Sequence, residues 1–201
     1  MSAAPPLTEP ALESAVLQMY SDVAQHPEKE FHFWSGRPAA EMVGYAAAWL
    51  EGAPAAAVES FAGVGNPHRH LALAPGETVV DLGSGAGLDL FIAAQRVAPA
   101  GRAIGVDLND EMLEKARGLA AGAGLTHVEL RKGRIEDPPV ENESADAVIS
   151  NGVINLSFRK KRVMAEAFRI LRPGGRASLT DVVSDSLIPE SIRNDPKLWA
   201  S

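Results

Sequence analysis

One stretch decides the fold of this chain: Val79-Val80-Asp81-Leu82-Gly83-Ser84-Gly85-Ala86-Gly87-Leu88-Asp89. An apolar run that closes with an aspartate predicts a short buried strand, and three glycines at alternate positions predict a tight turn. Glycine permits positive φ and lets the backbone approach a ligand without a Cβ in the way. The helix expected from Leu88 offers unpaired N–H groups at its first turn. The stretch therefore predicts a ligand-binding turn between a strand and a helix.

Short apolar strands continue to alternate with helices after this turn. The expected strands are Thr78–Leu82, Ala103–Asp107, His127–Lys132, Ala145–Ser150 and Arg176–Val182. The expected helices are Leu88–Val97, Asp110–Gly122, Phe158–Leu171 and Pro189–Asn194. This order is typical of an α/β fold with a central, mostly parallel sheet and helices on both of its faces. Ligands of such sheets bind at the carboxyl ends of the strands.

The residues before the first strand have a different pattern. Apolar residues recur at helical spacing over Glu9–Ala24, and a second helical pattern is carried by Met42, Tyr45, Ala46, Trp49 and Leu50. Between them, His26–Gly36 reads as a loop with three aromatic residues and two histidines. We therefore expect an N-terminal helical lid or substrate segment over residues 1–70 and a ligand-binding domain over residues 71–201.

Composition excludes several classes of protein. The 201 residues carry 19 Lys and Arg against 26 Asp and Glu, so the formal net charge is −7, which disfavours a nucleic-acid partner. The absence of cysteine excludes disulfides, cysteine-ligated zinc and a thiol nucleophile among these residues. No apolar run approaches the ~20 residues that span a bilayer, and the first six residues lack the pattern of a signal peptide. We expect a cytoplasmic location and no membrane partner.

Three aspartates accompany the glycine turn. Asp81 ends the first strand, Asp89 opens the following helix, and Asp107 ends the second strand 20 residues after Gly87. An acidic residue at that distance can accept both hydroxyls of a ribose. Carboxylates beside a glycine turn suit a zwitterion with a positive centre better than they suit phosphates.

Two other interpretations compete with this one. A dinucleotide site needs Gly-x-Gly-x-x-Gly, but position 88 is Leu, so an NAD-dependent oxidoreductase is disfavoured. Alternatively, the glycines make only tight turns and Asp107 caps the helix that begins near Asp110. The common register of Asp81, Asp89 and Asp107 weighs against that second interpretation.

Further motifs follow the same order along the chain. They are Ile104–Met112, Lys132–Asp137, Ser150–Leu156 and Leu171–Arg176. Together with the glycine turn they resemble the class I S-adenosylmethionine-dependent methyltransferases, over about Glu77 to Trp199. Ile149–Ser157 and Ile192–Trp199 make the chain most similar to the arsenite methyltransferase branch.

The resemblance implies a Rossmann-like class I methyltransferase fold, with S-adenosylmethionine as the methyl donor. By position, the methionine moiety of the donor is expected to contact Asp81, Gly83, Ser84, Gly85, Gly87 and Asp89. The ribose is expected to contact Asp107, and the adenine to lie near Leu108, Met112, Ile135 and Glu136. Asn151 is expected at the end of the fourth strand, near the donor methionine.

The chain departs from that branch in two respects. Arsenite methyltransferases hold trivalent arsenic with cysteine thiolates, and the position of one of them is Gly152 here. Soft metalloids select thiolates, so we expect an acceptor other than cysteine-bound arsenite. The family fold usually continues for two more strands beyond the point that corresponds to Ser201. Either the chain is truncated, or the fifth strand lies at an exposed edge of the sheet, where a homodimer would form.

The catalytic residues are less clear than the donor site. His32 and Trp34 are candidates on the substrate side, with Asn151, because a segment before the first strand often covers the cofactor in this superfamily. Alternatively, the aromatic residues beside His32 only pack the N-terminal helices, and His32 is exposed. No general base can be assigned, and His68-Arg69-His70 has no third ligand in view, so no metal is predicted.

The leading hypothesis is thus an enzyme that transfers a methyl group from S-adenosylmethionine to a small molecule. The alternative is a non-catalytic module that binds S-adenosylmethionine and regulates or partners another protein.

Overall fold

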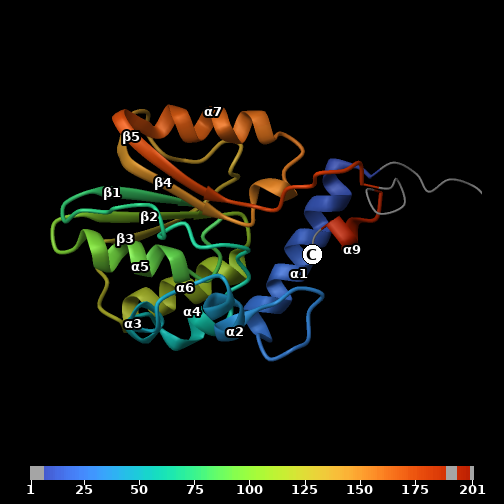
Figure 1. Ribbon diagram of the computed structural model, residues 1–201, viewed down its shortest axis with the longest axis horizontal. Coiled ribbons are helices and arrows are strands. Elements are labelled where there is room, and N and C mark those ends of the chain that lie inside the picture. Colours follow the sequence, from blue (N-terminus) through green and yellow to red (C-terminus); the bar gives the residue numbers. More distant parts are fainter. Residues whose placement is uncertain (1–6, 189–193, 200–201) are drawn as a thin grey trace, which may run out of the picture.

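The computed structural model describes residues 7–188 and 194–199, and it centres on one five-stranded sheet (Figure 1). The strands are β1 (Thr78–Leu82), β2 (Arg102–Asp107), β3 (Val128–Lys132), β4 (Ala145–Asn151) and β5 (Leu171–Thr180). Their order across the sheet is β3-β2-β1-β4-β5, and each pair of neighbours is parallel. The chain thus moves outward from β1 to β3 and then returns to the other side of β1. This reversal puts a switch point between β1 and β4, where open α/β sheets bind their ligands.

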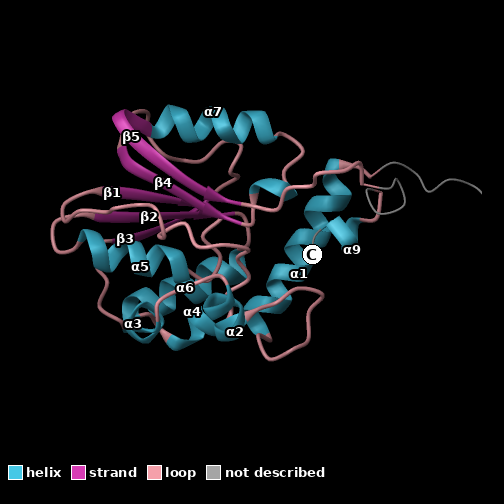
Figure 2. Ribbon diagram, viewed as in Figure 1, coloured by secondary structure: helices cyan, strands magenta, loops and turns pink. Residues whose placement is uncertain are grey.

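Helices cover both faces of the sheet, as the alternating pattern predicts (Figure 2). α5 (Leu88–Val97) and α6 (Asp110–Gly122) pack on one face, and α7 (Lys160–Ile170) packs on the other. Successive residues of a strand point to opposite faces. Val80 and Val148 accordingly belong to the cluster with Val163 and Ile170 of α7. Their neighbours Val79, Ala147 and Ile149 belong to the cluster with Val97 of α5.

The glycine turn has the backbone that the sequence predicts. Gly83, Gly85 and Gly87 have φ values of +79°, +51° and +95°, which side-chain-bearing residues rarely adopt. A Cβ on Gly87 would lie 2.8 Å from the ring of Phe91, and one on Gly83 would lie 2.5 Å from Val153. These two positions therefore need glycine for conformation and for space.

The N-terminal segment forms four helices outside the sheet. α1 (Glu9–Gln25) lies beyond the carboxyl ends of the strands and contacts α6, while the short C-terminal α9 (Pro196–Trp199) packs against it (Figure 1). α2 (Gly36–Met42), α3 (Ala47–Gly52) and α4 (Ala55–Glu59) form a layer outside α5 and α6. A 3-10 turn, η1 (Ile154–Leu156), follows β4.

The single helix expected through Met42 and Leu50 is wrong. Gly44 has φ of +89°, and Ala46 is extended, so α2 ends at Met42 and α3 begins at Ala47. The break turns Tyr45 inward, where it is 5% exposed. A buried tertiary position thereby overrides the local helical pattern.

The other element boundaries differ less. β5 begins at Leu171, not Arg176, because Leu171 pairs with Ala145 before the strand bulges over residues 172–175. It ends at Thr180, and α7 begins at Lys160, two residues later than expected. The helix expected at Pro189–Asn194 falls mainly on residues outside the described part of the chain. Within residues 7–188 and 194–199, no helix is both long and apolar enough to cross a membrane.

Candidate functional site

A pocket lies where β1, β2 and β4 end, between the sheet and α1. The pocket is lined by residues from the glycine turn, from the segments after β2, β3 and β4, and from α1. Eleven of the twelve predicted donor-binding residues line it. They are Gly83, Ser84, Gly85, Gly87, Asp89, Asp107, Leu108, Met112, Ile135, Glu136 and Asn151. The structure thus brings together residues that are up to 68 positions apart, although their contact with a cofactor stays a prediction.

Asp107 connects the end of β2 to the glycine turn. Its Oδ2 accepts a hydrogen bond of 2.7 Å from the Gly85 N–H, and its Oδ1 accepts one of 2.9 Å from the Asn109 N–H. Burial raises the pKa of the Asp107 carboxyl, while the backbone donors Asn109, Gly85 and Leu108 act in the opposite direction. The carboxylate is therefore fixed at the wall of the pocket by the loops that it joins.

Asp81 is the predicted residue that does not line the pocket. It lies behind the glycine turn, is 2% exposed, and its Oδ2 has no hydrogen-bond partner among the described residues. Burial, followed by the charges of Asp89 and Asp107, raises the pKa of the Asp81 carboxyl well above its usual range. A buried polar atom without a partner is costly, so a carboxyl in this position is unusual for a purely structural role.

Asp89 opens the first turn of α5 and is surrounded by hydrogen-bond donors. Its Oδ1 accepts from the Tyr45 hydroxyl at 2.5 Å, and its Oδ2 accepts from Asn151 Nδ2 at 3.0 Å. His68 Nε2 lies 3.1 Å from Oδ1, within ion-pair distance, although the angle falls outside that of a hydrogen bond. Burial and the neighbouring Asp89 charge raise the pKa of the Tyr45 hydroxyl, so it remains a donor.

Asn151 joins the site to the loop that precedes β1. Its Oδ1 accepts from the N–H groups of Val64 and Gly65 and from the Thr180 hydroxyl, at 2.9 to 3.0 Å. Its Nδ2 donates to Gly65 O at 2.8 Å as well as to Tyr45 and Asp89. The amide of Asn151 is therefore fully used inside the protein, and this arrangement makes it a structural centre of the site.

α1 forms the roof of the pocket and is held down by polar contacts. Asn109 Nδ2 donates to Leu17 O at 3.0 Å and to Ser21 Oγ at 2.9 Å. Lys115 Nζ donates to Ala24 O at 2.8 Å. These three contacts tie the second half of α1 to α6 and to the residue that caps it.

The first half of α1 is held by ion pairs. Arg134 lies 2.6 Å from Glu13, and Arg159 lies 3.0 Å from Glu9. Tyr20, in the second half of α1, faces the pocket, and burial together with Asp107 and Asp181 raises its pKa to about 12. The pocket wall is thus acidic, because Asp89, Asp107 and Glu136 all line it.

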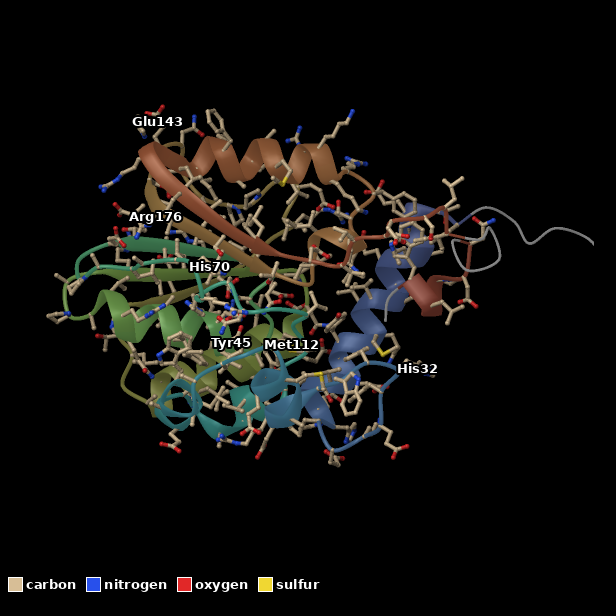
Figure 3. All side chains as sticks on the ribbon, viewed as in Figure 1. His32, Tyr45, His70, Met112, Glu143 and Arg176 are labelled. Atoms are coloured by element: carbon tan, nitrogen blue, oxygen red, sulfur yellow. The ribbon has the colours of Figure 1, made fainter. Side chains whose placement is uncertain are left out.

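The structure does not bring the substrate-side candidates His32 and Trp34 to the pocket. His32 is exposed and lies on the opposite side of α1 from Met112 in Figure 3, and Trp34 is 71% exposed. Phe31 and Phe33 stack on each other at 5.4 Å and pack toward Tyr20. Aromatic packing of the N-terminal segment was the alternative that the sequence left open for this loop.

His68 and His70 do not share a site. His68 is 2% exposed and faces Asp89, whereas His70 is exposed. Among the described residues, no group of three or more His, Asp or Glu is arranged to hold a metal ion.

Sequence reasoning missed several residues of the site. Tyr45 and His68 contact Asp89 from loops far from it in sequence, and neither contact has a local signal. The pocket-facing side of α1 was predictable in part, because Leu12, Val16, Leu17 and Tyr20 belong to one apolar helical face. That face packs over the ligand pocket.

Comparisons with known proteins agree with this geometry. A family model described as "Methyltransferase domain" matches residues 73–201. The arsenite methyltransferase of Halobacterium salinarum is 51% identical over 134 residues, which cover 67% of this chain and 34% of the relative. That of Aquipseudomonas alcaligenes is 39% identical over 135 residues, which cover 64% and 39%. The chain thus spans between a third and two fifths of the length of these relatives.

A solved structure agrees over nearly the whole chain. An arsenic(III) S-adenosylmethionine methyltransferase from Chlamydomonas reinhardtii matches 97% of this chain and 55% of its own, with a TM-score of 0.62 and 32% identity. The match extends to the N-terminal segment, which the family model leaves out.

The buried position of Asp81 predicts a pH-dependent effect of Asp81→Asn on stability. The folded-state pKa of Asp81 is raised, so the folded protein binds more protons than the unfolded chain between the two pKa values, and it loses stability as pH rises through that interval. The variant lacks this loss. Its free energy of unfolding, relative to wild type, should therefore increase from pH 4 to pH 8, by about 1.4 kcal/mol per unit of pKa shift.

Urea denaturation at pH 4, 6 and 8 measures this difference. Asp110→Asn is the matched control, because Asp110 is exposed and pairs only with Lys132 at the surface. A difference between Asp81→Asn and wild type that stays constant with pH would contradict the assignment.

Proposed function

The chain belongs to the methyltransferase domain family, and from this premise we propose that it is an S-adenosylmethionine-dependent methyltransferase that acts on a small-molecule acceptor. One observation carries the proposal: three glycines with positive φ stand beside Asp89 and Asp107 at the carboxyl ends of the central strands. Such a wall admits close backbone contact and favours a ligand with positive charge.

The residues present fit the donor. S-adenosylmethionine supplies an electrophilic methyl group on a positively charged sulfonium. Asp107 would accept the ribose hydroxyls, Asp89 and the glycine turn would hold the methionine moiety, and Met112 with Ile135 would flank the adenine. Ser84 Oγ, which is buried without a partner among the described residues, is a further polar atom that the donor would use. Asp81 does not line the pocket, so it would influence the bound donor through its negative charge and not through direct contact.

The protein's task in this reaction is orientation. Methyl transfer from a sulfonium is an in-line displacement, and holding two reactants in line can contribute about 7–11 kcal/mol. α1 covers the pocket and its ties to Asn109, Lys115 and Arg134 would keep water away from the reacting atoms. We assign residues 1–70 to this covering and acceptor-side role, and residues 71–201 to donor binding.

The acceptor is proposed to be a small molecule other than cysteine-bound arsenite. The 201 residues contain no cysteine, and Gly152, the position at which the resemblance to arsenite methyltransferases implies a cysteine, lines the pocket. Val64 is the nearest neighbour of Gly152, since a Cβ on Gly152 would lie 3.3 Å from Val64 Cγ1. The side chain nearest to Gly152 is therefore apolar and offers no thiolate.

The other interpretations have less support. No observation on the described residues favours a non-catalytic module, and the relatives are named as methyltransferases, not dinucleotide oxidoreductases. The net charge of −7 and the acidic pocket support a small-molecule acceptor over a nucleic acid. A cytoplasmic location, with which the absence of cysteine is compatible, would be tested by cell fractionation.

We also infer a homodimer through β5. β5 pairs with β4 on one side, and on its other side no described strand adjoins it. Unpaired strand edges tend to pair with another chain. Phe168 of the adjacent α7 is 81% exposed and Met164 is 49% exposed, so apolar surface accompanies the open edge.

The donor site predicts the effect of Asp107→Asn. The variant removes the carboxylate charge while keeping the shape, and hydrogen bonds to a charged acceptor contribute about 1.5–3 kcal/mol. The dissociation constant for S-adenosylmethionine should rise at least tenfold, measured by isothermal titration calorimetry. Asp110→Asn, three residues away, should bind like wild type. Unchanged affinity in Asp107→Asn, or no binding by wild type, would contradict the proposed function.

The acceptor proposal predicts slow methylation of arsenite. Transfer of labelled methyl from S-adenosylmethionine is measured with arsenite and with a panel of thiol, hydroxyl and amine acceptors. An arsenite methyltransferase relative serves as positive control. Turnover of arsenite at the rate of the relative would show that the absent thiolates are not needed here.

The dimer predicts a mass of two chains by light scattering. Phe168→Glu, which adds charge beside the open edge, should shift the protein toward monomer without loss of donor affinity. A wild-type monomer at concentrations of about 100 μM would overturn the inference, since stable dimers assemble well below that range.

A further inference from the structure

Two hydrogen-bond donors and one imidazole nitrogen at ion-pair distance contact the Asp89 carboxylate, and of these three side chains one comes from the methyltransferase domain itself. Asn151 belongs to β4, but Tyr45 lies in the turn between α2 and α3, and His68 lies in the loop between α4 and β1. The family model begins at residue 73. Both contacts to Asp89 Oδ1 thus come from the segment that precedes the matched domain.

His68 is built into this position. Its side chain is 0% exposed, and its ring lies edge-on to Tyr45 at 6.4 Å and to Trp49 at 6.1 Å. The guanidinium of Arg96 covers the Trp49 ring at 4.7 Å. Neither ring nitrogen of His68 has a hydrogen-bond partner among the described residues, and Asp89 Oδ1, which lies 3.1 Å from Nε2, is the ionisable group that the ring faces.

The loop and the turn that supply His68 and Tyr45 are linked to each other. Asn66 Oδ1 accepts from the His68 N–H at 3.0 Å, and Asn66 Nδ2 donates to Gly44 O at 2.9 Å. Tyr45 lies in the interior of the molecule, between α2 and the sheet (Figure 3). The two contacts to Asp89 therefore form one unit, fixed by Asn66.

Charge makes this unit necessary. Asp89 lies close enough to Asp81 for the two carboxylates to raise each other's energy. Among the described residues around Asp89, His68 is the one nitrogen base at ion-pair distance. Without His68, the described contacts of the Asp89 carboxylate would be the hydrogen bonds from Tyr45 and Asn151, beside a second buried carboxylate.

We propose that His68 is a positioning residue for the methyl donor: by its contact with Oδ1 it holds the Asp89 carboxylate toward the pocket, where that carboxylate accepts the α-ammonium group of the donor. This inference rests on the proposed function. It makes the segment before residue 73 part of the donor site, through one side chain that never touches the donor.

Two ligands separate this role from a general loss of structure. S-adenosylmethionine carries a sulfonium and the α-ammonium group, whereas 5′-methylthioadenosine has the same nucleoside with a neutral thioether sulfur and no amino acid. A residue that acts through Asp89 affects only the first ligand. A residue that merely supports the pocket affects both. S-adenosylhomocysteine, a thioether that keeps the α-ammonium group, controls for the sulfonium charge and should lose affinity in His68→Ala as S-adenosylmethionine does.

The test compares His68→Ala, His68→Gln and the control His70→Ala by calorimetry with both ligands. In His68→Ala the affinity for S-adenosylmethionine should fall about tenfold, because Asp89 loses the ring that faces its Oδ1 and fixes its orientation. The affinity for 5′-methylthioadenosine should change less than twofold. His68→Gln, which restores an N–H donor, should recover part of the loss, and His70→Ala should bind both ligands like wild type.

The outcomes are distinct. Equal losses for both ligands in His68→Ala, or no loss for either, overturn the inference while leaving the proposed function intact. Wild-type protein that binds neither ligand overturns the proposed function and the inference with it. If His68→Ala fails to fold, Tyr45→Phe decides, because it removes only the hydroxyl donor to Oδ1 and should show the same selective loss. Equal binding of both ligands to wild-type protein and to Tyr45→Phe would then overturn the inference.

Discussion

Three carboxylates concentrated at one end of a parallel sheet are the constraint on which this structure depends. Asp81, Asp89 and Asp107 converge where β1 and β2 end, and the pKa values of Asp81 and Asp107 are raised mainly because the protein removes them from water. Backbone N–H groups and neutral side chains offset part of that cost. A positively charged ligand would offset more of that cost. The pocket therefore holds buried negative charge that the protein's own residues compensate only in part.

The N-terminal segment supplies much of what stabilises this arrangement. α1 is hydrogen-bonded to Asn109 of the site, and the loops that carry Tyr45 and His68 contact the site at Asp89. Because Asn151 binds Val64 and Gly65 as well as Asp89, the end of β4 and the loop before β1 form one hydrogen-bonded unit. The segment and the sheet therefore fold around a shared polar centre.

The sequence predicts the sheet well where local signals are strong. β1, α5 and α6 have the expected boundaries. Glycines follow β1 and precede α5, and Asn109 caps the first turn of α6. It fails at Tyr45, where Gly44 breaks a helical pattern and burial beside Asp89 determines the conformation. The contact of His68 with Asp89 has no sequence signal. In His68-Arg69-His70 the sequence does not distinguish the two histidines, and only the folded structure buries His68 and exposes His70. Such long-range contacts are set by tertiary packing, which periodicity does not report.

The position of α1 has a consequence for turnover. Because α1 covers part of the pocket and is held at both halves, the exchange of cofactor in the proposed reaction would require this helix to move. Two of its fastenings, Arg134 with Glu13 and Arg159 with Glu9, are partly exposed ion pairs that dissolved salt weakens. Under the proposed function, the ionic strength of the solution would then affect how readily α1 moves and how fast cofactor is exchanged, without altering the methyl-transfer step itself.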